Sequence, residues 1–452
     1  MIESIHYKMK MKGIKLGMIA ILLYSNYSML CAQDSWNLIT CIDYAIDNNI
    51  DLNQKYNQVE TQKINLLESR AQMLPDLNLG SNVSLNFGRS IDGRDNSITY
   101  NQTLWNNYGL QSSVDIFGGL VKYNSIRYNK YLLAASQEGA LLYKNQLIFQ
   151  IISSYNMVLF NKGLLDVAKT QLELSDDQYK RMQRLVDVGK SSPLTAQEMK
   201  SQWAADKLNY TIAQNNLRKS TLELKQLLRV KADQEFQVQT SDVASHSAGA
   251  IPGIDSLFSQ AVNTLPEIKQ REYLYNAAEK DLLTAKGGYF PKIYLSAGLN
   301  SGYFNGDTLD YMTQIENNQN QWINMGIRIP IFNRASVYSN IKRKKIAVKD
   351  SQCELEKQKE SLYSEIWNAL NELQAAESEY QSSLELLEFS KLTLQSVSRK
   401  LEKGLASSTD FDAAKQRFAS AEAGLLKSKL IFVMRSQMLE FYRTGNWEHM
   451  RG

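Results

Sequence analysis

The fold is decided by residues 76–88, which read DLNLGSNVSLNFG. Five odd positions between Leu77 and Phe87 carry apolar side chains, and every even position carries Asp, Asn, Gly or Ser. Alternation with a period of two predicts a β-strand that has one apolar and one polar face. The same alternation recurs in three other segments, so the sequence predicts four strands. These further segments are 108–116, 292–300 and 323–331.

The strands predict an outer-membrane β-barrel. A soluble sandwich would also show alternation, because it buries its apolar faces as a core. Only four strands occur in the chain, and small Asn, Ser and Gly side chains stand opposite the apolar ones, which favours an apolar face turned to lipid. Hydrocarbon cannot pair an open strand edge, and single-chain barrels begin at about eight strands. We therefore expect several subunits to share one barrel, and three subunits would supply 12 strands.

The chain repeats one plan twice. The segment LPDLNL at 74–79 recurs as FPKIYL at 290–295, an offset of 216 residues. Further matches at nearly the same offset include Gly189 and Gly404. A constant offset between several matches indicates a tandem duplication. The predicted units are a first repeat at 33–230, a linker at 231–253 and a second repeat at 254–452.

Long helices are predicted between the strands. Segments 119–187 and 334–402 contain no proline, and each would span about 100 Å at about 1.5 Å per residue. Shorter helices are predicted to pair with them, at 35–73, 195–229, 254–288 and 411–444. The expected fold is mostly α with a small β part, in which long helical hairpins form a trimeric α-barrel beneath the shared 12-stranded barrel. An antiparallel coiled-coil scaffold would give the same helix patterns, so the strands decide between the two. The loops at 89–99 and 305–321 are expected to be extracellular.

The start of the chain predicts export. Residues 1–32 combine a basic start, a short apolar stretch and Ala32 before the expected cleavage point, which is the pattern of a secretory signal peptide. Cys31 leaves acylation as a lipoprotein open as an alternative. After cleavage Cys41 and Cys353 remain, which is no disulfide framework.

Composition excludes several classes of protein. The formal charge is +4, of which the predicted signal peptide carries +3, so the mature chain lacks the basic footprint of a nucleic-acid binder. His246 and His449 alone follow the signal peptide, which leaves little for a histidine-based triad or a zinc site. There is no phosphate-binding loop of the GxxxxGK type. We therefore predict no enzyme, no cofactor and no metal site.

Motifs beside the strands and turns carry a resemblance to a known family. They are WNLxxCIxxA at 36–45, the prolines at 75 and 291, DIFGG at 115–119, PIFN at 330–333 and GxxSSxDF at 404–411. In this order, over essentially all of the mature chain, they resemble the TolC-like outer-membrane efflux family.

The resemblance implies a trimeric channel-tunnel in the outer membrane of a Gram-negative-type bacterium, extending into the periplasm. Such a channel passively conducts substrates within a tripartite efflux or type I secretion system. The implied partners are two further copies of the chain, a periplasmic adaptor, an inner-membrane pump of the RND, ABC or a similar class, and outer-membrane lipid, with no nucleic acid. The alternatives are a non-conducting trimeric scaffold and an adhesin, although an adhesin of this kind gathers its four strands at the C-terminus.

The resemblance also implies two kinds of site residue. Val188, Gly189, Gly404 and Leu405 match tip positions at which family members dock the adaptor. The alternative for the two glycines is that they only permit the turn between antiparallel helices.

Asp410 matches an inward-facing aspartate of the family's periplasmic aperture, with Asp412 close by. Threefold symmetry would make a ring of three carboxylates, which favours cations. The alternative for Asp410 is a helix cap. The family's second ring aspartate falls on Ala413, and its tyrosine and arginine gate partners fall on Leu401 and Ala406, so this part of the family's lock is absent.

Overall fold

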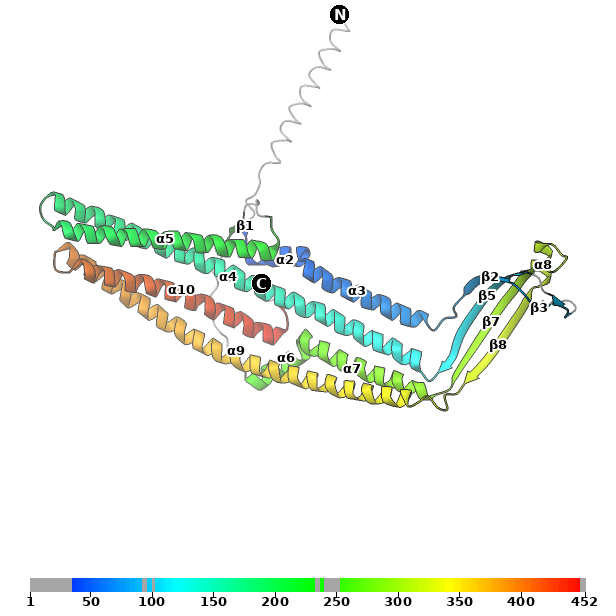
Figure 1. Ribbon diagram of the computed structural model, residues 1–452. Helices are drawn as coiled ribbons and strands as arrows, with labels where there is room; N and C mark the ends of the chain where they lie inside the picture. Colours follow the sequence, from blue (N-terminus) through cyan, green and yellow to red (C-terminus); the bar gives the residue numbers. More distant parts are fainter. Residues whose placement is uncertain (1–34, 92–95, 100–101, 232–235, 240–252, 448–452) are drawn as a thin grey trace, which may run out of the picture.

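The computed structural model describes residues 35–91, 96–99, 102–231, 236–239 and 253–447. The predicted signal peptide and most of the predicted linker therefore lie outside the described residues. Long helices form an elongated body, and a β-sheet stands at one end of it (Figure 1). The described chain is mostly helical with a four-stranded antiparallel sheet, as the sequence predicts.

Two helices of 67 residues each run along the body: α4, Val121–Asp187, and α9, Ser336–Glu402. Both begin within two residues of the predicted start and end at the predicted residue. Each follows two successive residues with left-handed backbone angles, Gly119-Leu120 and Arg334-Ala335. The chain therefore makes the same sharp turn from strand into long helix in both halves.

Six shorter helices pair with the two long ones. They are α2 Leu38–Asn48, α3 Ile50–Ala71, α5 Pro193–Leu228, α6 Ile254–Thr264, α7 Pro266–Lys286 and α10 Ser408–Thr444. Helices α3 and α5 pack end to end along α4, and α7 and α10 pack along α9. Because α4 also contacts α7 and α10, the two halves form one continuous helical layer.

Two of the predicted short helices are in fact divided. The segment predicted at 35–73 breaks at Asn49, whose side chain accepts a hydrogen bond from the Leu52 amide (2.8 Å) and so caps α3. The segment predicted at 254–288 breaks before Pro266, which begins α7. Proline is favoured at a first helical position and disfavours helical backbone in the residue before it. The prediction of one uninterrupted helix in each segment is therefore wrong.

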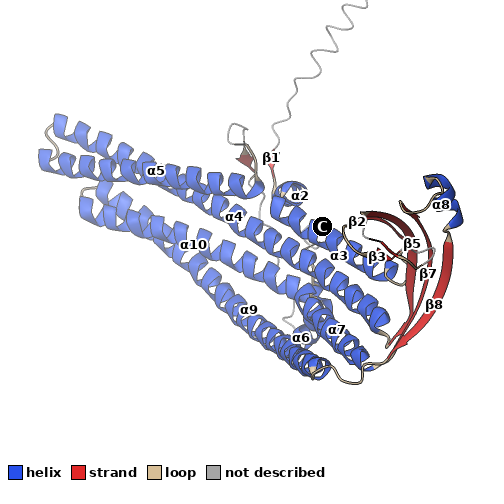
Figure 2. Cartoon of the chain, turned by 45° about the vertical axis from the view of Figure 1, so that its right-hand side comes forward, coloured by secondary structure: helices blue, strands red, loops and turns tan. Residues whose placement is uncertain are grey.

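The main sheet has the order β2-β5-β7-β8, with every pair antiparallel. Its strands are β2 Asn78–Asn86, β5 Thr103–Gly118, β7 Lys292–Phe304 and β8 Asn320–Arg328. The sheet is strongly curved (Figure 2), and β2 and β8 form its two open edges. Strand β5 is longer than the predicted 108–116 and contains a bulge between Asp115 and Phe117.

Three smaller features differ from the prediction. Strand β1, Ser35–Trp36, lies at the start of the segment predicted as a helix at 35–73. It pairs with β6, Gln237–Val238, inside the predicted linker. The loop predicted at 89–99 contains strands β3 and β4, Ser90–Ile91 and Ile98–Thr99. The loop predicted at 305–321 contains a helix, α8, at Tyr311–Asn317.

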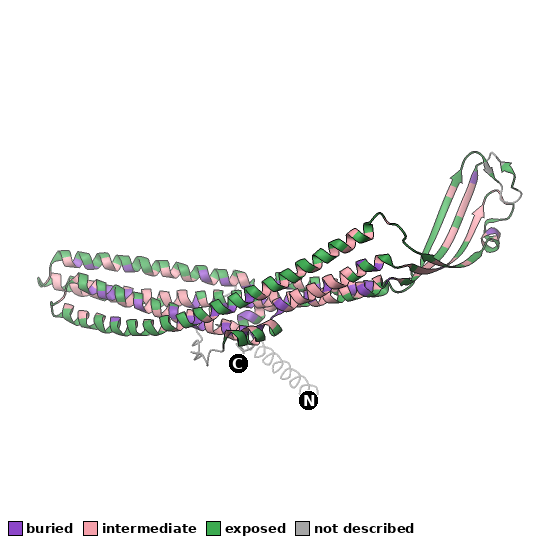
Figure 3. Cartoon of the chain, turned by 90° about the horizontal axis from the view of Figure 1, so that it is seen from below, coloured by how far each residue is buried: buried purple, intermediate pink, exposed green. Residues whose placement is uncertain are grey.

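Most of the apolar face of the sheet is open. Ile323 is 80% exposed, and Leu79 and Met325 are also exposed on the same face. Figure 3 shows that buried residues follow the helices, whereas the sheet is mostly exposed or intermediate. No second sheet covers this face in the described residues, so the sandwich interpretation is wrong.

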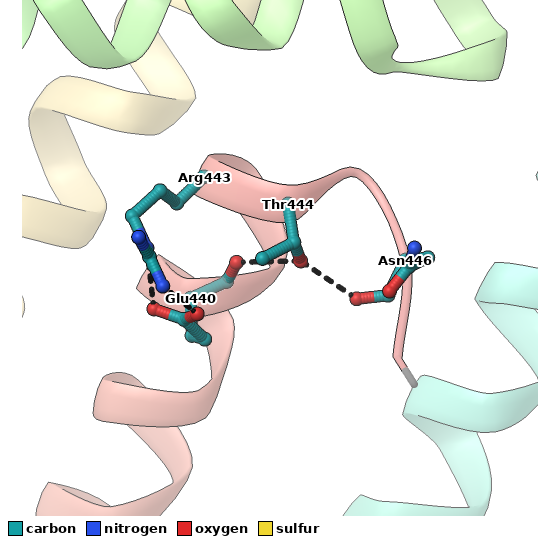
Figure 4. A network of polar contacts seen from close by, with 4 residues as sticks. All are labelled: Glu440, Arg443, Thr444 and Asn446. Carbon is teal, nitrogen blue, oxygen red and sulfur yellow. Dashed lines mark hydrogen bonds and ion pairs between the residues drawn. The ribbon is translucent and has the colours of Figure 1, made fainter. Parts of the chain in front are cut away.

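The buried core lies between the helices. One cluster joins α2, α4 and α5, and a second joins α6, α9 and α10. Met438 and Phe441, near the C-terminal end of α10, pack against both clusters. Figure 4 shows the turn that ends this helix. There Arg443 pairs with Glu440 (2.5 Å), and the Thr444 hydroxyl lies 2.9 Å from the Glu440 carbonyl oxygen and 3.0 Å from that of Asn446. This turn places Trp447 in the first cluster.

Candidate functional site

The two hairpin tips, at the end of the body far from the sheet, have the same backbone structure. At the first tip the Lys190 amide donates to the Leu185 carbonyl (2.7 Å), and the Gly189 amide donates to the Val186 carbonyl (2.9 Å). The second tip repeats both bonds around Gly404, at 2.8 and 3.0 Å. This double pattern is the Schellman motif, which ends a helix with a left-handed residue.

Backbone angles explain both tip glycines. Gly189 and Gly404 each have φ +69°, and no atom lies within 4 Å of the point where a Cβ would stand. Glycine is therefore required by the left-handed conformation and not by lack of space. The neighbouring Val188 and Leu405 are 65% and 73% exposed, so each tip presents one large apolar side chain to its surroundings.

Asp410 lies in the first turn of α10, beside the second tip. Its carboxylate accepts hydrogen bonds from the Ser407 hydroxyl (2.7 Å) and the Ser407 amide (3.0 Å), and its own amide donates to the Ser407 hydroxyl (3.1 Å). This reciprocal pair is a capping box, so Asp410 does cap the helix. The same hydrogen bonds hold the pKa of Asp410 below its usual value. Because the side chain remains exposed, its negative charge is available to the solvent.

Asp412 has a different environment from Asp410. It is half-buried between the two hairpins, where it faces Lys415, Asp206 and Glu198. Burial raises the pKa of Asp412, with the two neighbouring carboxylates adding to this and Lys415 opposing it. The two aspartates are close in sequence, but Asp410 is exposed to solvent and Asp412 is half-buried between the hairpins.

A buried ion pair lies one turn further along α10. Lys415 is 1% exposed, and its ammonium group pairs with the buried carboxylate of Asp206 on α5. Gln202 also donates to Asp206 (3.3 Å). Loss of either partner would leave the other as a buried unpaired charge, which is strongly destabilising.

Three polar contacts join the first hairpin to the second near the tips. Besides the Lys415–Asp206 pair, Arg181 pairs with Glu402 (2.9 Å), and the Ser408 hydroxyl donates to Glu198 (3.0 Å).

Sequence reasoning missed these three contacts. One signal was present, because Glu198, Gln202 and Asp206 recur every four residues and must share one helix face. Their partners on the second hairpin stand about 210 residues away and have no such pattern.

The described residues contain no group of three or more His, Cys, Asp or Glu side chains that could hold a metal ion. Among the helices of the described chain, none is both long enough and apolar enough to cross a membrane.

Comparison with known sequences gives a family match in both halves of the chain. The model of the family "Outer membrane efflux protein" matches residues 41–228 and 257–439. The chain is 22% identical to the probable outer membrane lipoprotein SilC of Salmonella typhimurium, over 84% of this chain and 80% of the relative. It is 23% identical to the cation efflux system protein CusC of Escherichia coli O157:H7, over 85% and 81% respectively.

The fold is also that of solved outer-membrane channels. A crystal structure of CusC superposes with a TM-score of 0.79 at 19% identity, covering 90% of this chain and 92% of CusC. The CmeC outer membrane channel of Campylobacter jejuni superposes with a TM-score of 0.77 at 17% identity, covering 91% and 86%. The two matched segments span most of the chain, and they show that it belongs to the outer membrane efflux protein family, whose members are non-enzymatic outer-membrane channels of efflux pumps.

Proposed function

We propose that three copies of this chain close into one conduit, which receives substrates from an inner-membrane pump through a periplasmic adaptor and conducts them passively across the outer membrane. As the outer-membrane component of an efflux pump, the chain works with other pump components. The threefold symmetry and the contacts between protomers described next are our proposal. The observation that carries it is that one protomer leaves matching open edges in its sheet and in its helical layer.

The two open sheet edges are equal in length. Strands β2 and β8 have nine residues each, and each is paired on one side only within the described chain. Such edges cannot remain unpaired in hydrocarbon. Pairing β8 of one protomer with β2 of the next satisfies both edges and closes three protomers into 12 strands.

The register of the sheet supports this closure. Asn78, at the lower end of β2, stands in the same row as Trp322, six residues above Arg328 at the lower end of β8. If the two edges overlap fully, each protomer is shifted along the strand direction by six residues, or about 20 Å, relative to its neighbour. This shift is spread over the width of one protomer, which is four strands spaced about 4.8 Å apart. The resulting tilt of about 45° lies at the upper end of the range for membrane barrels.

The helical layer has corresponding edges. Helix α9 contacts α7 and α10 on one side, and its opposite side carries exposed Trp367 and Phe389. At the other end of the layer, α3 exposes Leu67 and α5 exposes Leu208. A protomer whose β8 meets the next β2 would also bring α9 against the next α3 and α5, and would cover these apolar side chains.

The tips are the proposed contact with the adaptor, through Val188, Gly189, Gly404 and Leu405. Their supporting feature is the exposed apolar side chain that each tip presents beside a fixed turn. Asp410 is proposed to line the aperture, with Asp412 behind it. We infer that opening separates the two hairpins at their three polar contacts.

The division into a signal peptide at 1–32 and two repeats joined by a linker at 231–253 is part of the same proposal. Related proteins are named for cations, antibiotics and toluene. A conduit that takes its selectivity from the pump would accommodate this range, so we propose no substrate class for this chain.

Disulfide crosslinking tests the assembly. Full overlap places Asn324 of one protomer opposite Asn82 of the next, and paired Cα atoms within about 7 Å can be bridged. In a Cys353→Ser background, Asn82→Cys with Asn324→Cys should give a covalent trimer on oxidation. The purified trimer should then open conducting pores in planar lipid bilayers.

The matched control pairs Asn82→Cys with Arg328→Cys, which the same register separates by about 13 Å along the strand. This control should remain monomeric on a denaturing gel. Crosslinking of the control instead of the test pair would contradict the register. A folded protein that neither crosslinks nor conducts would contradict the conduit and favour a scaffold.

A further inference from the structure

Helix α8 lies on the apolar face of the sheet. The Ser301 hydroxyl donates to the Ile315 carbonyl (2.5 Å), and the Tyr303 ring lies 5.0 Å from the ring of Tyr311. Side chains along β7 alternate between its two faces, so Ser301 and Tyr303 lie on the same face as the apolar Leu299. The segment that connects β7 and β8 therefore folds back over the side of the sheet proposed to face lipid.

Side-chain amides fix α8 to the end of β7. Strand β8 pairs with β7 only as far as Asn300, although β7 continues to Phe304. Beyond this point the buried Gln314 accepts from the Phe304 amide (2.9 Å) and donates towards the Phe304 carbonyl (3.2 Å), and Asn318 donates to the Gly302 carbonyl (2.9 Å). The helix thus replaces a strand partner, so it is a built element with a fixed position.

Beneath α8 the sheet carries a polar patch. Tyr108 shares a hydrogen bond with Tyr311 (2.5 Å), Asn106 donates to Tyr108 (2.7 Å), and the Ser81 hydroxyl donates to Asn106 (3.3 Å). Together with Ser301, these groups interrupt an otherwise apolar face. Polar groups in hydrocarbon must find partners within the protein, and α8 supplies the phenol and the carbonyl that complete this set.

The same level of the sheet is apolar where α8 does not reach. Val83 stands in one row with Asn106 and Tyr303, and it is 63% exposed on β2. On the surface of α8 itself, Met312 is 62% exposed, and the preceding Leu309 is also exposed. Leu309 and Met312 are therefore exposed at the height where the sheet beneath is polar. Exposed Glu316 lies one turn from Met312 on the same side of α8, where its carboxylate can reach the level of the lipid headgroups.

We propose that α8 is a lipid-facing cover that places Leu309 and Met312 in the outer leaflet of the outer membrane. It extends the apolar belt of the barrel across the polar patch, and its partner is the acyl-chain region beside the lipid headgroups. Continuity with the exposed apolar face of the sheet selects lipid as the occupant. The proposal rests on the membrane barrel proposed above.

Spin-label accessibility tests it in the assembled protein reconstituted into lipid vesicles. In the Cys353→Ser background, a nitroxide is attached at Met312→Cys. Its collision rates with oxygen, which concentrates in lipid, and with a water-soluble nickel chelate are compared. Two reference positions are measured alongside: Ile323→Cys on the apolar face of β8, and Glu354→Cys, an exposed polar position on α9 far from the sheet.

We expect the oxygen-to-nickel ratio at position 312 to be several-fold above that at 354 and to approach that at 323. A water-like ratio at 312 with a lipid-like ratio at 323 would overturn the cover while keeping the barrel. Low accessibility of position 312 to both reagents would assign α8 to a contact between protomers and would equally overturn it. Water-like ratios at both 312 and 323 would overturn the barrel itself.

Discussion

Glu267 is a carboxyl group that titrates near neutral pH. It lies in the first turn of α7, where burial and the nearby charge of Glu365 raise its pKa to about 7. Tyr442 also contacts this site, and its pKa is raised by burial and by the two carboxylates. The positive end of the helix dipole would favour the charged form of Glu267, so burial is the larger effect here.

This pKa predicts that stability falls as the pH rises. The ordinary pKa of Glu267 is 4.5, so between pH 4.5 and about 7 the folded chain holds a proton that the unfolded chain has lost. Its contribution to the free energy of unfolding is full below this window and decreases through it. Glu267→Gln should flatten the dependence of the melting temperature on pH and should melt above the wild type at pH 8.

Exposed Glu354→Gln is the control and should follow the wild-type curve. Parallel curves for wild type and Glu267→Gln would contradict the assignment of this titration to Glu267.

At the scale of elements, the Lys415–Asp206 pair connects α10 to α5. Lys415→Met keeps the length of the side chain but leaves Asp206 buried without its cation, which costs about 3–5 kcal/mol in comparable sites. We expect a lower melting temperature and faster hydrogen exchange at both tips. The variant should also open more often in planar bilayers, because a contact between the hairpins is lost.

The double variant Lys415→Met with Asp206→Leu is the matched control. It should recover most of the stability, since no buried charge remains unpaired. Equal destabilisation of the single and double variants would show that packing, and not the ion pair, holds the hairpins together.

The elements differ in how far sequence could predict them. The strands and long helices were predictable because each repeats a simple period over many residues, and the tandem offset predicted the same order of elements in both halves. The two helix breaks lie at Asn49 and Pro266. The helical pattern of the sequence continues past both residues, so the pattern alone did not show the breaks. Helix α8 depends on Gln314 reaching the backbone of Phe304, a tertiary contact with no periodic signal.

The candidate site was partly predictable for the same reason. Gly189 and Gly404 mark turns through a local requirement, and Asp410 follows Ser407 at capping distance. Lys415 reads as an ordinary solvated lysine until the fold places it beside Asp206. The docking and aperture roles of the tip residues stay predictions.

At the scale of the whole molecule, threefold symmetry would multiply a single charge into a ring. Asp410→Asn keeps an oxygen that can accept from Ser407, so it should preserve the cap while removing the charge. We expect the proposed trimer to lose much of its preference for cations over anions in planar bilayers. Because the pKa of Asp410 is lowered, the wild type should retain its selectivity at pH 5.

Asp412→Asn is the comparison for this measurement. Its carboxyl faces Lys415 between the hairpins, so the selectivity should change less than in Asp410→Asn. Unchanged selectivity in Asp410→Asn would return this residue to helix capping alone.

The short connections between strands and helices set the width of the proposed tube. Four strands and four helices per protomer must share one circumference where they meet, yet a tilted strand occupies about 7 Å of it and a packed helix about 8–10 Å. The helical part of the proposed tube should therefore be the wider one, so the chain should step outward between strand and helix. The left-handed pairs Gly119-Leu120 and Arg334-Ala335 lie in two of these connections. Once the tips separate, the electrical resistance of the open conduit should be concentrated in the barrel.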